Sequence, residues 1–212
     1  NAAGKSAWDI DYLQAGMYNE RQMKMKKVGT LMSMEKLHAM NGIRCACGKV
    51  HRFDAEVISG SGVLQRLPQI AAGYGRKFFV LSDRNTWQAA GARVCRLLED
   101  AGLCCVSHCF REEAPEPDEK TVGSAVMHFP ADCDGIVAVG SGVINDCCKV
   151  FAHAAGRPQV IVGTAPSMDG YASNCASMII KQVKTTLYSD CPATIIADTE
   201  IMKDAPARML WA

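Results

Sequence analysis

Short apolar runs alternate with longer amphipathic segments through the middle of this chain. Between residues 86 and 101, apolar side chains recur every three or four positions, as on one face of a helix, and Gly102 follows as a stop signal. The apolar runs are short, which is typical of buried strands. The pattern predicts strands at 78–81, 103–110, 135–139, 160–162 and 193–198, and helices at 86–101, 118–128 and 143–155.

Strands separated by helices of about 10–15 residues are typical of a parallel sheet. The run 135–139 contains no polar side chain, which suits a strand that is covered on both faces. Right-handed crossovers then leave few topologies. We therefore expect an α/β fold, with a Rossmann-like parallel sheet and helices on both faces.

The N-terminal part of the chain differs from this alternating body. Residues 1–40 are polar, with a stretch rich in Met and Lys at 17–34, and predict a helical N-terminal extension. Residues 41–212 form the α/β domain. The chain stops at Ala212 within an apolar helical pattern. We expect it to be part of a longer protein.

The alternation also breaks down after Thr164. Residues 165–174 are polar and contain glycine, which predicts a loop. Residues 181–191 fit either a hairpin or an irregular excursion. A further helix is expected to begin at Ala205, after the last strand.

Composition narrows the possible functions. The 212 residues are 49% apolar and carry a formal net charge of +1, so nothing favours a nucleic-acid or membrane partner. No apolar run reaches the roughly 18 residues of a bilayer span, and the first 30 residues lack a signal peptide's apolar core. Eleven cysteines, an odd number, argue against a disulfide framework. These features predict a cytoplasmic protein with mostly buried thiols.

The turn Gly140-Ser141-Gly142 lies between a predicted strand and a predicted helix. Glycine lets the backbone approach a ligand closely, and the free N–H groups of a helix's first turn attract anions. A dinucleotide pyrophosphate is the natural occupant at the carboxyl end of a parallel strand. The alternative is a tight turn that merely needs glycine, because the segment is not the full G-x-G-x-x-G fingerprint.

Asp83 follows the first predicted strand and has two interpretations of equal weight. Its carboxylate can accept hydrogen bonds from ribose hydroxyls, which favours NAD over its 2′-phosphorylated form. Alternatively, Asp83 or Asn85 caps the helix that starts at Thr86. The two roles are compatible, so NAD against NADP stays open.

Several other motifs have a structural interpretation that we favour. Cys45-Ala46-Cys47, followed by His51, could bind a metal, but Cys-x-Cys is tighter than usual zinc spacing, and a hairpin or strand-edge segment is the better interpretation. We favour buried packing for the helical thiols of Cys147 and Cys148, and a surface position near a helix C-terminus for His153. A further group of polar residues could face a substrate phosphate, but a solvated hairpin is the better interpretation. This group consists of Lys181, Lys184, Thr185 and Thr186.

Two longer stretches together point to a family. The sequence VGSGVIND at 139–146 and the sequence GTAPSMDGYAS at 163–173 resemble the bacterial branch of the glycerol-1-phosphate dehydrogenases. That branch belongs with glycerol dehydrogenases and dehydroquinate synthases to the iron-containing alcohol dehydrogenase superfamily. The similarity runs from about Cys45 to the end, including residues 81–86 and 191–198.

The resemblance implies a dehydroquinate synthase-like N-terminal domain and a role for each matching residue. The family more often has three glycines in the turn, and here Ser141 replaces the middle one. Asp169 would contact the substrate. The cofactor would be NAD or NADP, with its adenosine ribose held by Asp83. Its pyrophosphate would be held by Gly140, Ser141 and Gly142, and Asn145 and Asp146 would complete that turn. Further contacts with the cofactor would come from Thr164, Ser167 and Ser173.

The resemblance also implies a divalent metal, zinc or nickel, bound by one Asp and two His on a helical C-terminal domain. None of the five histidines here lies in the matching context, and the Asp belongs to a G-x-G-D segment beyond Ala212. We therefore expect the C-terminal metal-binding domain to be absent from these residues. No catalytic residue or metal ligand is assigned to this chain, and little activity is expected from it alone.

The resulting hypothesis is a metal-assisted NAD(P)-dependent dehydrogenase that interconverts glycerol 1-phosphate and dihydroxyacetone phosphate. This chain would supply its nucleotide-binding part, and homodimers are common among relatives. Two alternatives stay open: a glycerol or polyol dehydrogenase or dehydroquinate synthase-like enzyme, and a nucleotide-binding module without catalysis.

Overall fold

The computed structural model describes residues 34–50, 52–112 and 114–211. The chain divides into two compact units, Asn1–Met40 and Asn41–Ala212. In the first unit the helix α2 spans Met34–Ala39, and the rest of the predicted extension, residues 1–33, lies outside the described residues. None of the described helices is both long and apolar enough to cross a membrane.

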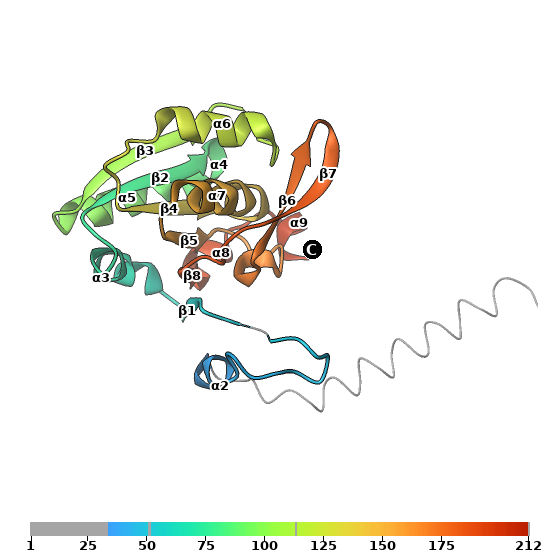
Figure 1. Cartoon of the computed structure of the whole chain (residues 1–212). Coiled ribbons are helices and arrows are strands. Elements are labelled where there is room, and N and C mark those ends of the chain that lie inside the picture. Colours follow the sequence, from blue (N-terminus) through green and yellow to red (C-terminus); the bar gives the residue numbers. More distant parts are fainter. Residues whose placement is uncertain (1–33, 51, 113, 212) are drawn as a thin grey trace, which may run out of the picture. The chain divides into compact units, whose positions relative to one another are not determined.

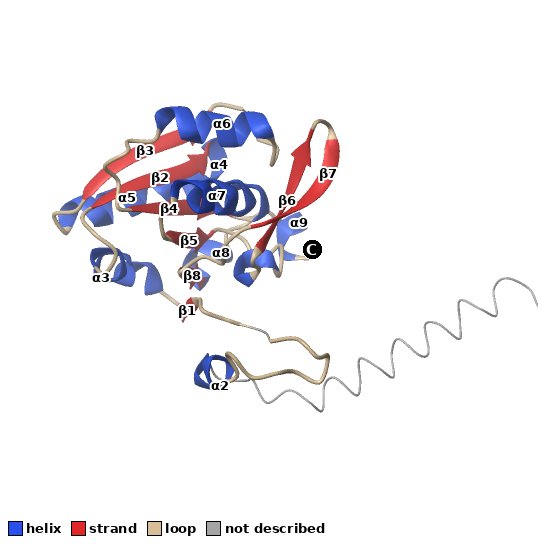
Figure 2. Cartoon of the chain, viewed as in Figure 1, coloured by secondary structure: helices blue, strands red, loops and turns tan. Residues whose placement is uncertain are grey.

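The second unit is built on a six-stranded sheet in which every neighbouring pair is parallel. The strand order is β1-β8-β5-β4-β2-β3, and the sheet runs through the middle of the unit in Figure 2. The strands are β1 (Glu56–Gly60), β2 (Lys77–Asp83), β3 (Cys104–Phe110), β4 (Gly135–Gly140), β5 (Gln159–Gly163) and β8 (Thr194–Asp198).

Helices connect these strands and cover the sheet. The first connections hold η1 (Val63–Arg66), α3 (Leu67–Ala72), α4 (Arg84–Thr86), the π-helical η2 (Trp87–Gly91) and α5 (Ala92–Asp100). Later ones hold α6 (Glu119–His128), α7 (Gly142–Ala155) and η3 (Gly170–Ala172), and α8 (Thr199–Met202) and α9 (Ala207–Leu210) follow the last strand.

Alternate side chains of the central strands enter two separate cores. In β4, Val137 and Val139 pack with the side chains of α3 and α5, whereas Ile136 and Ala138 pack with those of α6 and α7. Because successive strand residues point to opposite faces, a strand without polar residues must be covered on both. The expected α/β fold with helices on both faces is confirmed.

An antiparallel hairpin lies beside this sheet and next to α7 (Figure 1). It consists of β6 (Cys175–Ile180) and β7 (Val183–Tyr188), joined at Lys181 and Gln182, which both have positive φ. The hairpin interpretation of this region is therefore confirmed, and the hairpin starts before the expected segment 181–191.

The elements at the two ends of the unit differ from the expected ones. The sequence pattern missed β1, an edge strand with exposed residues, and α3, which follows it. The last helix begins at Ala207 rather than Ala205, because Pro206 occupies its N-cap. The short helix α8, which directly follows β8, was also not expected.

The order of the strands reverses at one place in the sheet. The chain goes from β2 outward to β3, crosses back to β4, and then continues in the other direction to β5 and β8. Parallel sheets bind ligands outside the carboxyl ends of the strands where the order reverses in this way. Here that point lies between the ends of β2 and β4, at Asp83 and Gly140.

A buried carboxylate joins the last strand to the first helical turn. Asp198 accepts hydrogen bonds from the backbone N–H groups of Gly62 (3.0 Å), Leu64 (3.0 Å) and Glu200 (3.0 Å). Burial raises the pKa of Asp198, but the three N–H donors outweigh it and hold the pKa below its usual value.

We expect Asp198→Asn to lower the free energy of unfolding by about 1–3 kcal/mol near neutral pH. Both oxygens of the charged Asp198 carboxylate accept hydrogen bonds, whereas an amide is neutral and has only one accepting oxygen. A depressed folded pKa stabilises the fold above about pH 4, and this contribution is lost as the pH falls through the folded pKa. Urea unfolding as a function of pH measures both effects. Asp100→Asn, at an exposed site on α5, is the control, and an equal effect there would contradict the prediction.

Candidate functional site

The predicted phosphate-binding turn lies where β4 passes directly into α7. Gly140 ends the strand, Ser141 is the N-cap residue, and Gly142 is the first helical residue. The Ser141 side chain does not cap the helix. The first turn of α7 therefore has no side-chain cap on its N–H groups, and uncapped N–H groups of this kind can bind an anion.

The two glycines of the turn are needed for different reasons. A Cβ atom on Gly140 would lie 2.5 Å from Cβ of Ile144, so only glycine lets the strand end this close to the helix. A Cβ on Gly142 would meet only Sδ of Met168, at 3.5 Å. Gly142 thus leaves open space in front of the helix, and Ser141 has a φ of −120°, which is ordinary for any residue.

Asn145 and Asp146 lie one turn further along α7, and their side chains hold neighbouring strands. Asn145 is fully buried, and its Oδ1 accepts a hydrogen bond from Nε2 of Gln159 at 3.3 Å. Asp146 Oδ2 accepts the backbone N–H of Ser177 at 3.1 Å. The two side chains fasten α7 to β5 and β6, and their contact with a cofactor stays a prediction.

The loop after β5 is tied to the turn. The backbone N–H of Thr164 donates to the carbonyl of Gly140 (3.1 Å), and the hydroxyl of Tyr171 points at the carbonyls of Ala165 (2.8 Å) and Gly140 (3.3 Å). Burial raises the pKa of Tyr171 to about 12, so the phenol stays protonated and donates. Asp169 is exposed beside this anchored segment.

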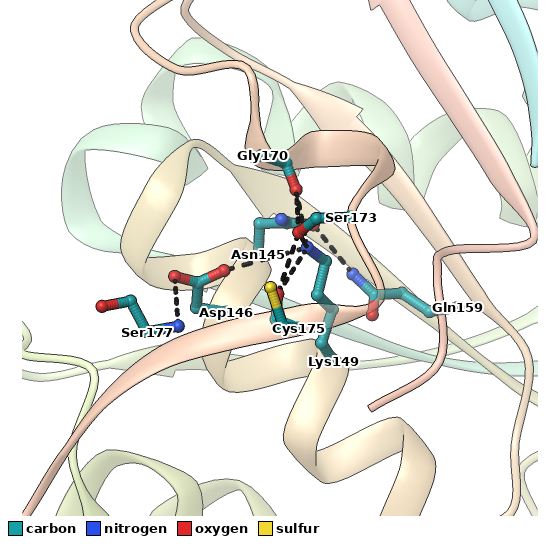
Figure 3. A network of polar contacts seen from close by, with 8 residues as sticks. All are labelled: Asn145, Asp146, Lys149, Gln159, Gly170, Ser173, Cys175 and Ser177. Atoms are coloured by element: carbon teal, nitrogen blue, oxygen red, sulfur yellow. Dashed lines mark hydrogen bonds and ion pairs between the residues drawn. The ribbon is translucent and has the colours of Figure 1, made fainter. Parts of the chain in front are cut away.

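Ser173 contacts a buried lysine that the sequence analysis did not single out (Figure 3). Lys149 Nζ donates to the carbonyl of Gly170 (2.6 Å), to Oγ of Ser173 (2.9 Å) and to the carbonyl of Cys175 (3.2 Å). Burial lowers the pKa of Lys149, and burial likewise raises the pKa of Asp146, 3.9 Å away. A lysine among the apolar residues of α7 was the available signal, because that helix face must be buried.

Asp83 is the N-cap of α4. Its Oδ1 accepts the N–H of Thr86 at 2.8 Å, and Thr86 Oγ1 accepts the N–H of Asp83 at 2.9 Å. This reciprocal capping box confirms the structural interpretation. It engages Oδ1, so the predicted contact of the carboxylate with a ribose remains compatible with it.

A cavity of about 330 Å³ lies between the start of α7 and the hairpin. Gly142 and Val143 line one side, Ser177 and Lys184 the other, and Asp146 lies between them. Lys184 is thus both part of an exposed hairpin and a wall of this cavity. Lys181 is at the exposed tip.

The structural interpretation holds for the two cysteines of α7, but the expectation of mostly buried thiols is wrong, because four of the eleven cysteines are buried, four are half-buried and three are exposed. Cys147 and Cys148 are buried, and burial raises the pKa of both thiols. Cys45 and Cys47 are exposed on a short turn that is closed by a bridge between Arg44 and Val50; His51 lies outside the described residues. Within the described part of the chain, no three His, Cys, Asp or Glu side chains gather as a metal site would require.

Comparison with known proteins shows the family of the chain. The family model for the iron-containing alcohol dehydrogenases matches residues 58–206. The chain belongs to this family. The match includes the turn, α7, the loop and the hairpin, so each candidate residue except those before residue 58 lies within the family's own sequence pattern.

Two curated relatives are similar over most of the chain. A glycerol-1-phosphate dehydrogenase (NAD(P)+) of Bacillus licheniformis is 35% identical over 175 residues, which cover 79% of this chain and 43% of that protein. One of Methanosarcina mazei is 33% identical, covering 74% and 44%. The chain thus spans less than half the length of the curated relatives it matches.

Solved structures support the fold. The glycerol dehydrogenase of Schizosaccharomyces pombe superposes with a TM-score of 0.68 at 22% identity, over 76% of this chain and 42% of that one. At this level of identity the superposition supports the fold of the sheet and its helices alone.

Gly140 and Gly142 differ in how much space surrounds them, and adding one methyl group at each position tests this difference. We expect Gly140→Ala to lower the free energy of unfolding by about 1–3 kcal/mol, because the new Cβ overlaps Ile144. Gly142→Ala is expected to cost less than about 0.5 kcal/mol, since its Cβ makes only ordinary contact. Urea unfolding followed by circular dichroism measures both, and equal losses would contradict this account of the turn.

Proposed function

We propose that the Asn41–Ala212 unit is the NAD(P)-binding part of a dehydrogenase that interconverts glycerol 1-phosphate and dihydroxyacetone phosphate. The observation that carries the proposal is the uncapped start of α7, opened by Gly142 at the point where the strand order reverses. Partial positive charge gathers at that helix end. A pyrophosphate is the ligand whose charge and size suit such a position.

The surrounding residues fit the rest of a dinucleotide. The carboxylate of Asp83, at the end of the adjacent strand, would accept from the adenosine ribose. Thr164 and Ser167 would contact the nucleotide from the loop after β5, and Ser173 from further along it. A bound nicotinamide accepts or returns the hydride, while these residues bind and orient it.

The exposed carboxylate of Asp169 supports a polyol-type substrate. It lies in a loop with several hydroxyl side chains, which suits recognition of substrate hydroxyl groups. Both curated relatives described above are named glycerol-1-phosphate dehydrogenases, which favours the phosphorylated substrate over glycerol, another polyol or a dehydroquinate synthase-like reaction. A nucleotide-binding module without catalysis is the remaining alternative.

The family name implies a metal, and the described residues do not supply a site for it. We propose that zinc or nickel serves the complete enzyme, that the enzyme works in the cytoplasm, and that it forms a homodimer. Its partner in the reaction is a small molecule rather than nucleic acid or membrane.

The turn is tested by NADH fluorescence titration with Gly142→Asp. An added carboxylate in front of α7 repels the pyrophosphate, and we expect the dissociation constant to rise at least about tenfold. Folding should be retained, because a carboxylate in the first helical turn is favourable. Gly123→Asp on α6, where an added Cβ also meets open space, is the matched control and should bind like the parent. Unchanged NADH binding by Gly142→Asp would refute the proposed pyrophosphate site.

The proposal assigns cofactor binding to this chain and the metal to another part of the complete enzyme, so the chain alone should have little activity. In EDTA-treated buffer this chain should oxidise NADH with dihydroxyacetone phosphate slowly or not at all, because its described residues offer no metal cluster. The measurement is NADH absorbance over time, with dihydroxyacetone as the unphosphorylated comparison. Rapid turnover under these conditions would show that catalysis needs no metal site beyond this chain.

A further inference from the structure

Lys149 is the one fully buried lysine side chain among the ion pairs of the described chain. It projects from the middle of α7 into the protein, and its relative exposure is 1%. Burying an ammonium group is costly unless each of its N–H donors finds a partner. The Asp146 carboxylate, 3.9 Å away, is too far for a hydrogen bond, so the partners that matter are elsewhere.

All three hydrogen-bond partners of Lys149 belong to one short segment (Figure 3). They are the carbonyls of Gly170 and Cys175 and the hydroxyl of Ser173, at 2.6, 3.2 and 2.9 Å. The Ser173 hydroxyl in turn reaches the same two carbonyls, at 3.0 and 2.9 Å. An ammonium group has three donors, so Lys149 uses its full capacity on the segment 170–175.

This segment directly follows Asp169, the predicted substrate contact. The loop is also fastened to β4, where the Tyr171 hydroxyl and the Thr164 N–H donate to the carbonyl of Gly140. The loop therefore has two attachments, one to the last residue of β4 and one to α7. Both belong to the strand and helix that form the turn Gly140-Ser141-Gly142.

We infer that Lys149 is a positioning residue that fixes the Asp169–Ser173 loop relative to the turn at the start of α7. The hydrogen bonds of the ammonium group go to the segment that follows Asp169 and not to the turn. It acts through the carbonyls of Gly170 and Cys175 and the hydroxyl of Ser173, so that nucleotide and substrate contacts from the loop are already in place before binding. The functional half of this inference rests on the proposed NAD(P) site, whereas the fastening of the loop does not.

The test compares Lys149→Met with the same substitution at an exposed site. Methionine keeps most of the length of the side chain and removes the three ammonium donors that bind Gly170, Ser173 and Cys175. Hydrogen–deuterium exchange of peptides covering residues 168–176 should become at least about tenfold faster, and the NADH dissociation constant should rise about tenfold. Lys120→Met on α6, which removes a surface ion pair with Glu112, should change neither.

A second control separates positioning from simple loss of stability. Cys148→Ala removes a buried side chain next to Lys149 that packs into the core beneath α7. It should lower the urea midpoint while leaving both the exchange of 168–176 and the NADH dissociation constant at parent values. Lys149→Arg, which retains a cation with several N–H donors, should recover part of the slow exchange.

The outcomes distinguish the inference from the proposed function. Faster loop exchange in Lys149→Met, in a chain that never binds NADH, would support the fastening and refute the cofactor site. Parent-like loop exchange in a folded Lys149→Met would overturn the inference. Should that variant not fold, the parent chain decides: ¹⁵N NMR should show a slowly exchanging Lys149 ammonium group, and a solvent-exchanged ammonium would overturn the inference.

Discussion

The arrangement of the candidate site depends on how closely β4 approaches the helix that follows it. Because Gly140 has no side chain, Ile144 can pack directly against the end of the strand, and α7 starts within two residues of β4. That short connection aims the first turn of the helix at the carboxyl edge of the sheet. A bulkier residue at Gly140 would push α7 away and move every group attached to it.

Several of those groups bring separate parts of the chain to the same place. Asn145 fastens α7 to β5, Asp146 fastens it to β6, and Lys149 fastens it to the segment after Asp169. These contacts lie on successive turns of one helix. The polar groups are largely buried, where hydrogen bonds are strong when made and expensive when lost. The helix thus carries both the candidate phosphate turn and the supports of the loop opposite it.

The sequence predicted those parts of the structure that local pattern determines. The runs in β2, β4 and β5 are apolar on both faces, and each was recognised as a strand. β1 was missed because an edge strand has one neighbour and keeps polar, exposed residues. Lys149 was missed for a related reason: lysine is expected at the surface, and its partners come from a segment more than twenty residues away.

The replacement of the family's middle glycine by Ser141 can now be judged on backbone geometry. With φ at −120°, this position lies outside the left-handed region that favours glycine. The demanding position is Gly140, where packing excludes even a methyl group. The hydroxyl of Ser141 does not cap the helix, which leaves it able to donate a hydrogen bond to a phosphate oxygen. The substitution therefore places no side chain at a left-handed position, and in the proposed site it would add one donor to the turn.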